Sequence, residues 1–191
     1  MRLNGEYDDR LVQEEDCGAI SEHDAALLVG LVLAIRPRVI AEVGTGWFRS
    51  IGAFHEGAMA LKAMTGQDVE IWSCDIRSSV VEKAIASFPA AHVVCGTSQD
   101  MLRAMASLQP ELIFIDGDHE IPGVKVDVEV MLRSATDDAV LVFHDTQCRR
   151  DSCGKVCSAL GGVCLRTGRG IGIVTARKAR LILENGQWPT L

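Results

Sequence analysis

The sequence has no excess of positive charge. Its 26 Asp and Glu residues outnumber its 19 Lys and Arg residues, which gives a formal net charge of −7. The nearest thing to a basic cluster is Arg149, Arg150 and Lys155, which is typical of a solvated helix start and could also meet an anionic substrate. A phosphate backbone is bound through a strong positive field, which this balance does not provide. The charge therefore argues against nucleic acid as a partner.

Long apolar runs are also missing. No stretch approaches the roughly 18 apolar residues of a membrane-spanning helix. The polar segment 1–16 has no apolar core of signal-peptide length. We therefore expect no membrane association and a cytoplasmic location.

Cysteine pairs of the C-x-x-C type are absent, although the chain has seven cysteines. In a cytoplasmic protein these thiols are expected to stay reduced. The densest set is Cys148, Cys153, Cys157 and Cys164, and its spacing matches no standard zinc pattern. Free thiols are favoured over a zinc site.

Internal repeats and low-complexity tracts are absent too. With 191 residues, 48% of them hydrophobic and 24% charged, the chain has the size and composition of one globular domain. We expect a single domain over residues 1–191. It comprises a polar leader (1–20), a leading helix (21–36), a cofactor-binding body and a tail (179–191).

What the sequence does contain is a regular alternation of apolar runs and helical patterns, which predicts a doubly wound, mostly parallel α/β sheet. The expected strands are 39–43, 69–74, 92–95, 112–115, 139–143, 163–166 and 170–174. The expected helices after the leading one are 48–64, 78–88, 98–108, 124–134 and 155–160. This pattern predicts about seven strands, helices on both faces and an antiparallel strand at the C-terminal edge. Residues 181–186 are predicted as one more edge strand or a docking tail.

Polar residues follow the predicted strands, at the sheet edge where such folds bind ligands. The first strand enters the turn 42–46 (Glu-Val-Gly-Thr-Gly), whose glycines let a ligand approach the backbone at a helix N-terminus. Asp75 ends the second strand and can accept hydrogen bonds from both hydroxyls of a ribose. Each feature alone is also explained by a tight turn or a helix cap, but together they predict a nucleoside-bearing cofactor. A nicotinamide dinucleotide is disfavoured, because Arg49 stands at the third glycine of G-x-G-x-x-G.

An acid followed by a G-x-G turn resembles the class I S-adenosylmethionine-dependent methyltransferases, over about residues 21–174. Within that class, segments 114–119 (FIDGDH) and 141–146 (LVFHDT) are similar to a bacterial branch of small-molecule O-methyltransferases and cephalosporin hydroxylase-like proteins. The resemblance implies S-adenosylmethionine as cofactor and a small-molecule acceptor, methylated at a hydroxyl. The cofactor-binding residues that it implies are Glu42, Gly44, Thr45, Gly46, Ser50, Asp75, Gly96, Thr97, Ser98 and Asp116.

The sequence departs from that family at one position. Phe48, preceded by Trp47, replaces the third glycine of E-x-G-x-G-x-G. These aromatic side chains either anchor the start of the following helix or line the acceptor pocket. The substitution keeps open an alternative: a catalytically altered or non-catalytic protein that binds S-adenosylmethionine or a nucleotide.

Asp116 and Asp145 end two neighbouring predicted strands, and paired carboxylates suit Mg²⁺. His144 adds an imidazole, which favours a softer divalent ion. The predicted metal ligands are therefore Asp116, His144 and Asp145, with helix caps as the alternative. His119 lies three residues after Asp116, where catechol-type enzymes carry a lysine that takes the acceptor proton. An imidazole suits that role or simple substrate positioning, so the predicted catalytic residues are His119, Asp116 and Asp145. A homodimer and the identity of the acceptor are left open.

Overall fold

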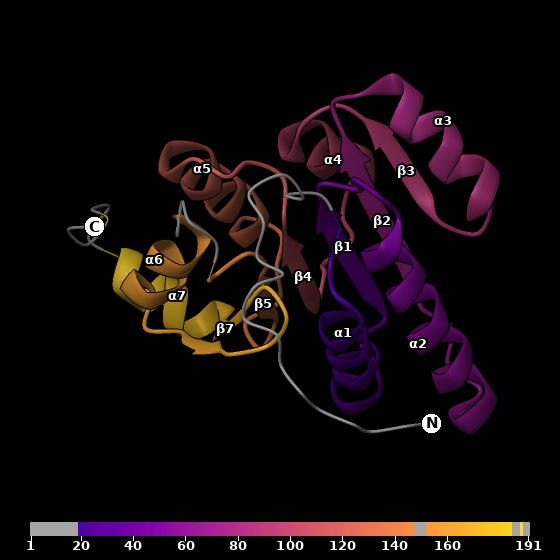
Figure 1. Ribbon diagram of the computed structural model, residues 1–191, viewed down its shortest axis with the longest axis horizontal. Coiled ribbons are helices and arrows are strands. Elements are labelled where there is room, and N and C mark those ends of the chain that lie inside the picture. Colours follow the sequence, from indigo (N-terminus) through magenta and orange to yellow (C-terminus); the bar gives the residue numbers. More distant parts are fainter. Residues whose placement is uncertain (1–18, 148–151, 185–187, 189–191) are drawn as a thin grey trace.

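The computed structural model describes residues 19–147, 152–184 and 188. In this part of the chain seven strands form one sheet in the order β3-β2-β1-β4-β5-β7-β6 (Figure 1). The strands are β1 (Val39–Val43), β2 (Glu70–Asp75), β3 (His92–Cys95), β4 (Leu112–Ile115), β5 (Val140–Phe143), β6 (Val163–Leu165) and β7 (Ile171–Thr175). The pairings among β1 to β5 are parallel, whereas β7 runs antiparallel to β5 and β6. The predicted doubly wound sheet is confirmed, with β7 one place inside the edge strand β6.

Helices cover both faces of the sheet (Figure 1). They are α1 (Glu22–Ile35), α2 (Arg49–Thr65), α3 (Ser78–Ser87), α4 (Ser98–Met105), α5 (Ile121–Leu132), α6 (Ser152–Ala159) and α7 (Ala176–Leu183). Strands β1 and β4 are buried along their whole length. This double cover explains why both strands are apolar without alternation.

Two apolar cores hold the layers together. On one face, α1 and α2 place Leu28 and Phe54 against Ile40 and Phe114 of the sheet. The rings of Phe54 and Phe114 meet edge to face, 5.6 Å apart. On the other face the buried residues of α4, α5, α6 and α7 share a core with the opposite side chains of β1, β4 and β5. Packing on both faces therefore holds the central strands, and the turns that follow them, in place.

The C-terminal segment differs from the sequence prediction. The edge strand expected within residues 181–186 is wrong, because Ala176–Leu183 forms α7. Thr175 caps this helix by accepting a hydrogen bond from the Lys178 N–H (3.4 Å). Ala176 and Ala179 are buried against the sheet. Residues 185–187, 189–191 and most of the predicted leader (1–18) lie outside the described residues.

Helix starts also differ by a few residues. α2 begins at Arg49, after Phe48, and α5 begins at Ile121, earlier than predicted. Pro122 lies in the first turn of α5, where its missing N–H has no partner to lose. Among the described helices, none has the length and apolarity to span a bilayer.

Candidate functional site

The strand order reverses between β1 and β4, and the polar residues that follow the strands gather at that point. The turn after β1 requires glycine at its first position. Gly44 has φ 94°, a left-handed conformation, and a Cβ there would collide with the backbone of Asp116 and lie 2.8 Å from Gly117 Cα. The turns after β1 and β4 therefore touch each other through a residue without a side chain.

Phe48 adopts a left-handed backbone conformation, which glycine reaches without strain. Its φ is 69° and its ψ is 0°, and it precedes the first residue of α2 without a side-chain cap. Its ring packs partly buried against the core between α1, α2 and the sheet. Trp47 is 67% exposed. Phe48 thus anchors the helix start, and Trp47 extends outward beside it.

A small hollow lies between the turn after β1 and the residues that precede α1. Its lining is formed by Ala19, Ile20, Thr45, Gly46, Trp47, Arg49, Ser50 and Asp116. Arg49 also donates a hydrogen bond from Nη1 to the Ile20 carbonyl oxygen (3.0 Å). Four residues predicted to bind the cofactor therefore line one hollow, namely Thr45, Gly46, Ser50 and Asp116. The hydrogen bond from Arg49 links the segment before α1 to the start of α2.

Glu42 is completely buried beneath this turn. Its Oε2 accepts a hydrogen bond from Ser73 Oγ (2.5 Å), and Ser73 Oγ lies 2.6 Å from Thr45 Oγ1. Burial raises the pKa of Glu42 to about 7, and hydrogen bonds from Ser50 and Ser73 only partly oppose this. Oε1 has no hydrogen-bond partner among the described residues. Sequence reasoning missed Ser73, which lies inside a predicted strand with no motif around it.

Asp75 joins the turn after β1 to the end of β2. The Gly46 N–H donates to Asp75 Oδ2 (3.0 Å), and Arg77 Nε and Nη2 donate to Oδ1 and Oδ2 (2.9 and 3.0 Å). Desolvation by itself would raise the pKa of Asp75, but the bonds from Arg77 and Gly46 lower it below its usual value. The predicted ribose acceptor is thus held beside the glycine turn by Arg77, whose side chain is 56% exposed.

The predicted cofactor-binding segment 96–98 lies next to Asp75, because the Gly96 N–H donates to the Asp75 carbonyl oxygen (3.0 Å). Thr97 forms a capping box with Asp100 at the start of α4. Ser98 Oγ donates to Asp127 Oδ1 (2.7 Å), both residues being buried. The two hydroxyls and the N–H groups of Gly96 and Thr97 are therefore engaged within the protein, which fixes this segment beside Asp75.

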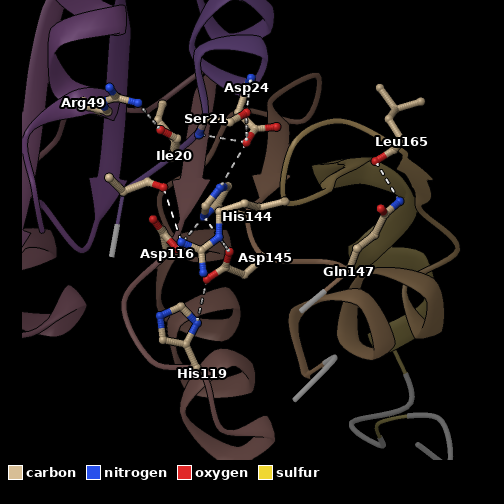
Figure 2. A network of polar contacts seen from close by, with 12 residues as sticks. Ile20, Ser21, Asp24, Arg49, Asp116, His119, His144, Asp145, Gln147 and Leu165 are labelled. Atoms are coloured by element: carbon tan, nitrogen blue, oxygen red, sulfur yellow. Dashed lines mark hydrogen bonds and ion pairs between the residues drawn. The ribbon is translucent and has the colours of Figure 1, made fainter. Parts of the chain in front are cut away.

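A second polar cluster follows β4 and β5, and Figure 2 shows it from close by. His144 is 2% exposed, and its Nδ1 lies 3.1 Å from Asp116 Oδ1 and 3.3 Å from Asp145 Oδ1. Its Nε2 lies 3.5 Å from Oδ2 of the buried Asp24, on α1. His119 Nδ1 lies 3.6 Å from Asp145 Oδ2. The predicted metal and catalytic residues are therefore brought together as expected.

The protonation of this cluster follows from its burial and its carboxylates. Desolvation would lower the pKa of His144, but hydrogen bonds to Asp116 and Asp24 raise it to about 10. Burial raises the pKa of Asp116, against the opposing effect of His144. Burial would also raise the pKa of Asp24, yet its bonds from His144, Thr167 and Ser21 hold it well below its usual range. His144 is accordingly an imidazolium at neutral pH.

Sequence reasoning missed two members of this cluster. Asp24 forms a capping box with Ser21, a pattern that predicts the start of a helix. The pattern does not predict that the Asp24 carboxylate is buried next to His144. Arg169 precedes Gly170 in the loop between β6 and β7, and its Nε lies 2.8 Å from Asp145 Oδ1. No motif in the sequence marks either residue as part of the site.

The same cluster has ligand atoms close enough together to hold a metal ion. One ligand atom each from Asp116, His144 and Asp145 can be chosen so that all lie within 4.8 Å of one another. The spacing therefore suits a divalent ion. Arg169 is a competing cation at this place, because its Nε already contacts Asp145 Oδ1.

Comparison with known proteins identifies a family and a shared fold. The model of a family described as a methyltransferase domain matches residues 46–146. Cofactor-bound Rv0187 from MTB is 21% identical, with 83% of this chain and 82% of that one covered and a TM-score of 0.69. The SAH-bound methyltransferase PaMTH1 from Podospora anserina is 15% identical, with 82% and 79% covered and a TM-score of 0.67. An O-methyltransferase from Bacillus cereus in complex with SAH is 15% identical, with 82% and 81% covered and a TM-score of 0.64. No curated protein matches the sequence.

Proposed function

The chain belongs to the methyltransferase-domain family whose model it matches, and we propose that it transfers a methyl group from S-adenosylmethionine to a hydroxyl of a small molecule. The observation that carries the proposal is the hydrogen bond between the Gly46 N–H and Asp75 (3.0 Å). It joins a glycine turn at a helix start to a carboxylate at the end of the next strand, which is the arrangement that a nucleoside-bearing cofactor requires. Solved structures of the same fold are bound to SAH or SAM, which supports this cofactor.

The residues present fit S-adenosylmethionine, which supplies an electrophilic methyl group on a sulfonium. Glu42 and the turn 44–46 would hold the methionine part, and a buried carboxyl with an unpartnered oxygen suits its ammonium group. Asp75 would bind the ribose after exchanging bonds with the exposed Arg77. Residues 96–98 would border the adenine through their backbone. Ser50 and Asp116, which line the hollow, complete the predicted set.

His119 is the proposed base for the acceptor hydroxyl. It is 32% exposed, and its Nδ1 faces Asp145 Oδ2 at 3.6 Å. This orientation turns Nε2 away from the carboxylate, where it can accept a proton. Methyl transfer is an in-line displacement, so the protein contributes mainly by aligning the acceptor and removing its proton. Asp116 and Asp145 form the polar wall opposite the base.

The alternative of a non-catalytic protein that binds the cofactor or a nucleotide rests on Phe48. The left-handed backbone at this position is retained and the ring is directed into the core. Both observations favour an intact cofactor turn. The net charge of −7 supports a small-molecule acceptor over nucleic acid. Single-domain organisation, a cytoplasmic location and a homodimer stay predictions.

Calorimetry with adenosylhomocysteine tests the proposal. Wild-type protein is expected to bind, and Asp75→Ala to weaken binding by about tenfold or more, because a charge-assisted hydrogen bond contributes about 1.5–3 kcal/mol. Arg77→Ala is the matched control, since it removes the partner of Asp75 and leaves the carboxylate. Absence of binding at millimolar ligand, or binding of NAD in its place, would overturn the cofactor assignment.

A further inference from the structure

The acidic cluster after β4 and β5 already contacts a cation of the chain itself. Arg169 Nε lies 2.8 Å from Asp145 Oδ1, and the two side chains are 18% and 5% exposed. The same oxygen lies 3.3 Å from His144 Nδ1, so it faces the centre of the cluster. The guanidinium of Arg169 therefore already contacts Asp145 Oδ1, an oxygen that a metal ion at this cluster would need as a ligand.

The backbone around Arg169 is fixed to the strand end that carries Asp145. The Gln147 N–H donates to the Arg169 carbonyl oxygen (3.1 Å), and the Thr146 N–H donates to that of Gly170 (3.3 Å). Gly170 has φ 89°, and a Cβ there would lie 2.5 Å from Thr146 Oγ1. Two backbone hydrogen bonds and the close contact at Gly170 thus hold the loop against the end of β5. This packing places the Arg169 guanidinium beside Asp145.

His144 lies inside the same set of carboxylates. Its Nδ1 is 3.1 Å from Asp116 and 3.3 Å from Asp145, and its Nε2 is 3.5 Å from Asp24 (Figure 2). Three carboxylates thus surround one imidazole, and the Arg169 guanidinium adds a positive charge on the side of Asp145.

We infer that Arg169 takes the place of a divalent metal ion as the counter-charge of the Asp116, His144 and Asp145 cluster. Arg169 is then a positioning residue. It holds the Asp145 carboxylate, whose other oxygen faces His119 Nδ1 at 3.6 Å. A dication among these ligands would be repelled by the guanidinium, whose Nε contacts Asp145 Oδ1 at 2.8 Å. Only the activity assay of this inference depends on the proposed methyl transfer.

Mn²⁺ binding followed by electron paramagnetic resonance tests the inference without any turnover. Wild-type protein and Arg169→Lys, which keeps the charge, are expected to show no saturable Mn²⁺ site at the cluster. Arg169→Ala is expected to gain a saturable Mn²⁺ site, because the cation that contacts Asp145 Oδ1 is then removed. Adding Asp145→Asn to that variant should abolish the gain. Arg166→Ala, at an exposed position three residues earlier, is the matched control and should behave as wild type.

The activity assay provides a second readout. Methyl transfer by the wild-type protein is expected to be unchanged by EDTA and by added Mg²⁺. A wild-type Mn²⁺ site that Asp145→Asn removes, or an EDTA inhibition that Mg²⁺ reverses, would overturn the inference. If no acceptor is methylated, the proposed function fails, while the Mn²⁺ titrations still decide between Arg169 and a metal ion.

Discussion

Phe48 combines a backbone conformation that favours glycine with a large side chain that packs on the core. The family pattern predicts glycine there, and the structure keeps the glycine conformation, with φ 69°. A non-glycine residue in the left-handed region is strained by roughly 1–2 kcal/mol. The partly buried ring of Phe48 offsets this strain by packing on the core. The backbone requirement and the packing gain therefore act in opposite directions at one position.

Comparison of Phe48→Gly with Phe48→Ala separates these two effects. Both variants lose the ring, but only glycine adopts φ 69° without strain. We expect Phe48→Gly to be more stable than Phe48→Ala by about 1 kcal/mol in chemical denaturation, the reverse of the usual order inside a helix. Ser87→Gly and Ser87→Ala, at the exposed end of α3, give the usual order for reference. Equal stabilities of the two Phe48 variants would contradict the backbone argument.

Glu42 makes stability depend on pH. Burial raises its pKa to about 7 from 4.5, so between these values the folded protein holds a proton that the unfolded chain releases. The free energy of unfolding therefore falls as pH rises through this window. Glu42→Gln removes the effect, so its stability relative to wild type should improve by up to about 3 kcal/mol between pH 5 and pH 8.

Urea denaturation at the two pH values measures this difference. Glu82→Gln, which changes an exposed carboxyl on α3, is the control and should show no comparable change. A constant difference between Glu42→Gln and wild type across the window would mean that Glu42 ionises normally in the folded protein.

At the scale of elements, most of the sheet could be predicted because its signal is local. Apolar runs as in Leu112–Ile115 and the glycine turn after β1 specify a strand and its exit without reference to the rest of the chain. α7 could not be predicted in this way. It follows β7 directly, with only Thr175 to mark the change. Its Ala, Arg, Lys and Leu residues favour a helix, but the apolar run Leu181–Leu183 also fits a strand, so the local pattern leaves both open.

α1 contributes a buried carboxylate to the fold in addition to its apolar face. Asp24 is fully buried, lies 3.5 Å from His144 Nε2, and accepts hydrogen bonds from Ser21. Asp24→Asn leaves the buried imidazolium with one carboxylate fewer, and we expect a loss of about 3 kcal/mol in the free energy of unfolding. Glu22→Gln, at an exposed position of the same helical turn, should lose less than about 0.5 kcal/mol. Similar losses for the two variants would mean that α1 is held by its apolar face alone.

For the whole molecule, the candidate site was predictable where it follows single strands and unpredictable where it joins distant segments. Glu42, Asp75, Asp116 and Asp145 lie at strand ends, and the rule for parallel sheets places them together. Arg169 reaches the same cluster from the loop before β7, because that strand inserts antiparallel beside β5. Side-chain direction and loop path are set by the assembled fold, so no local pattern reveals them.

The assembled site predicts how the reaction depends on the acceptor. If His119 removes the acceptor proton, His119→Ala should lower kcat about 100-fold for an aliphatic alcohol at neutral pH. 2,4-Dinitrophenol, which is fully ionised at the same pH, needs no base and should lose much less. His23→Ala, at an exposed position of α1, is the control. An equal loss of kcat for both acceptors would instead make His119 a residue that only orients the substrate, because orientation is needed whatever the protonation state of the acceptor.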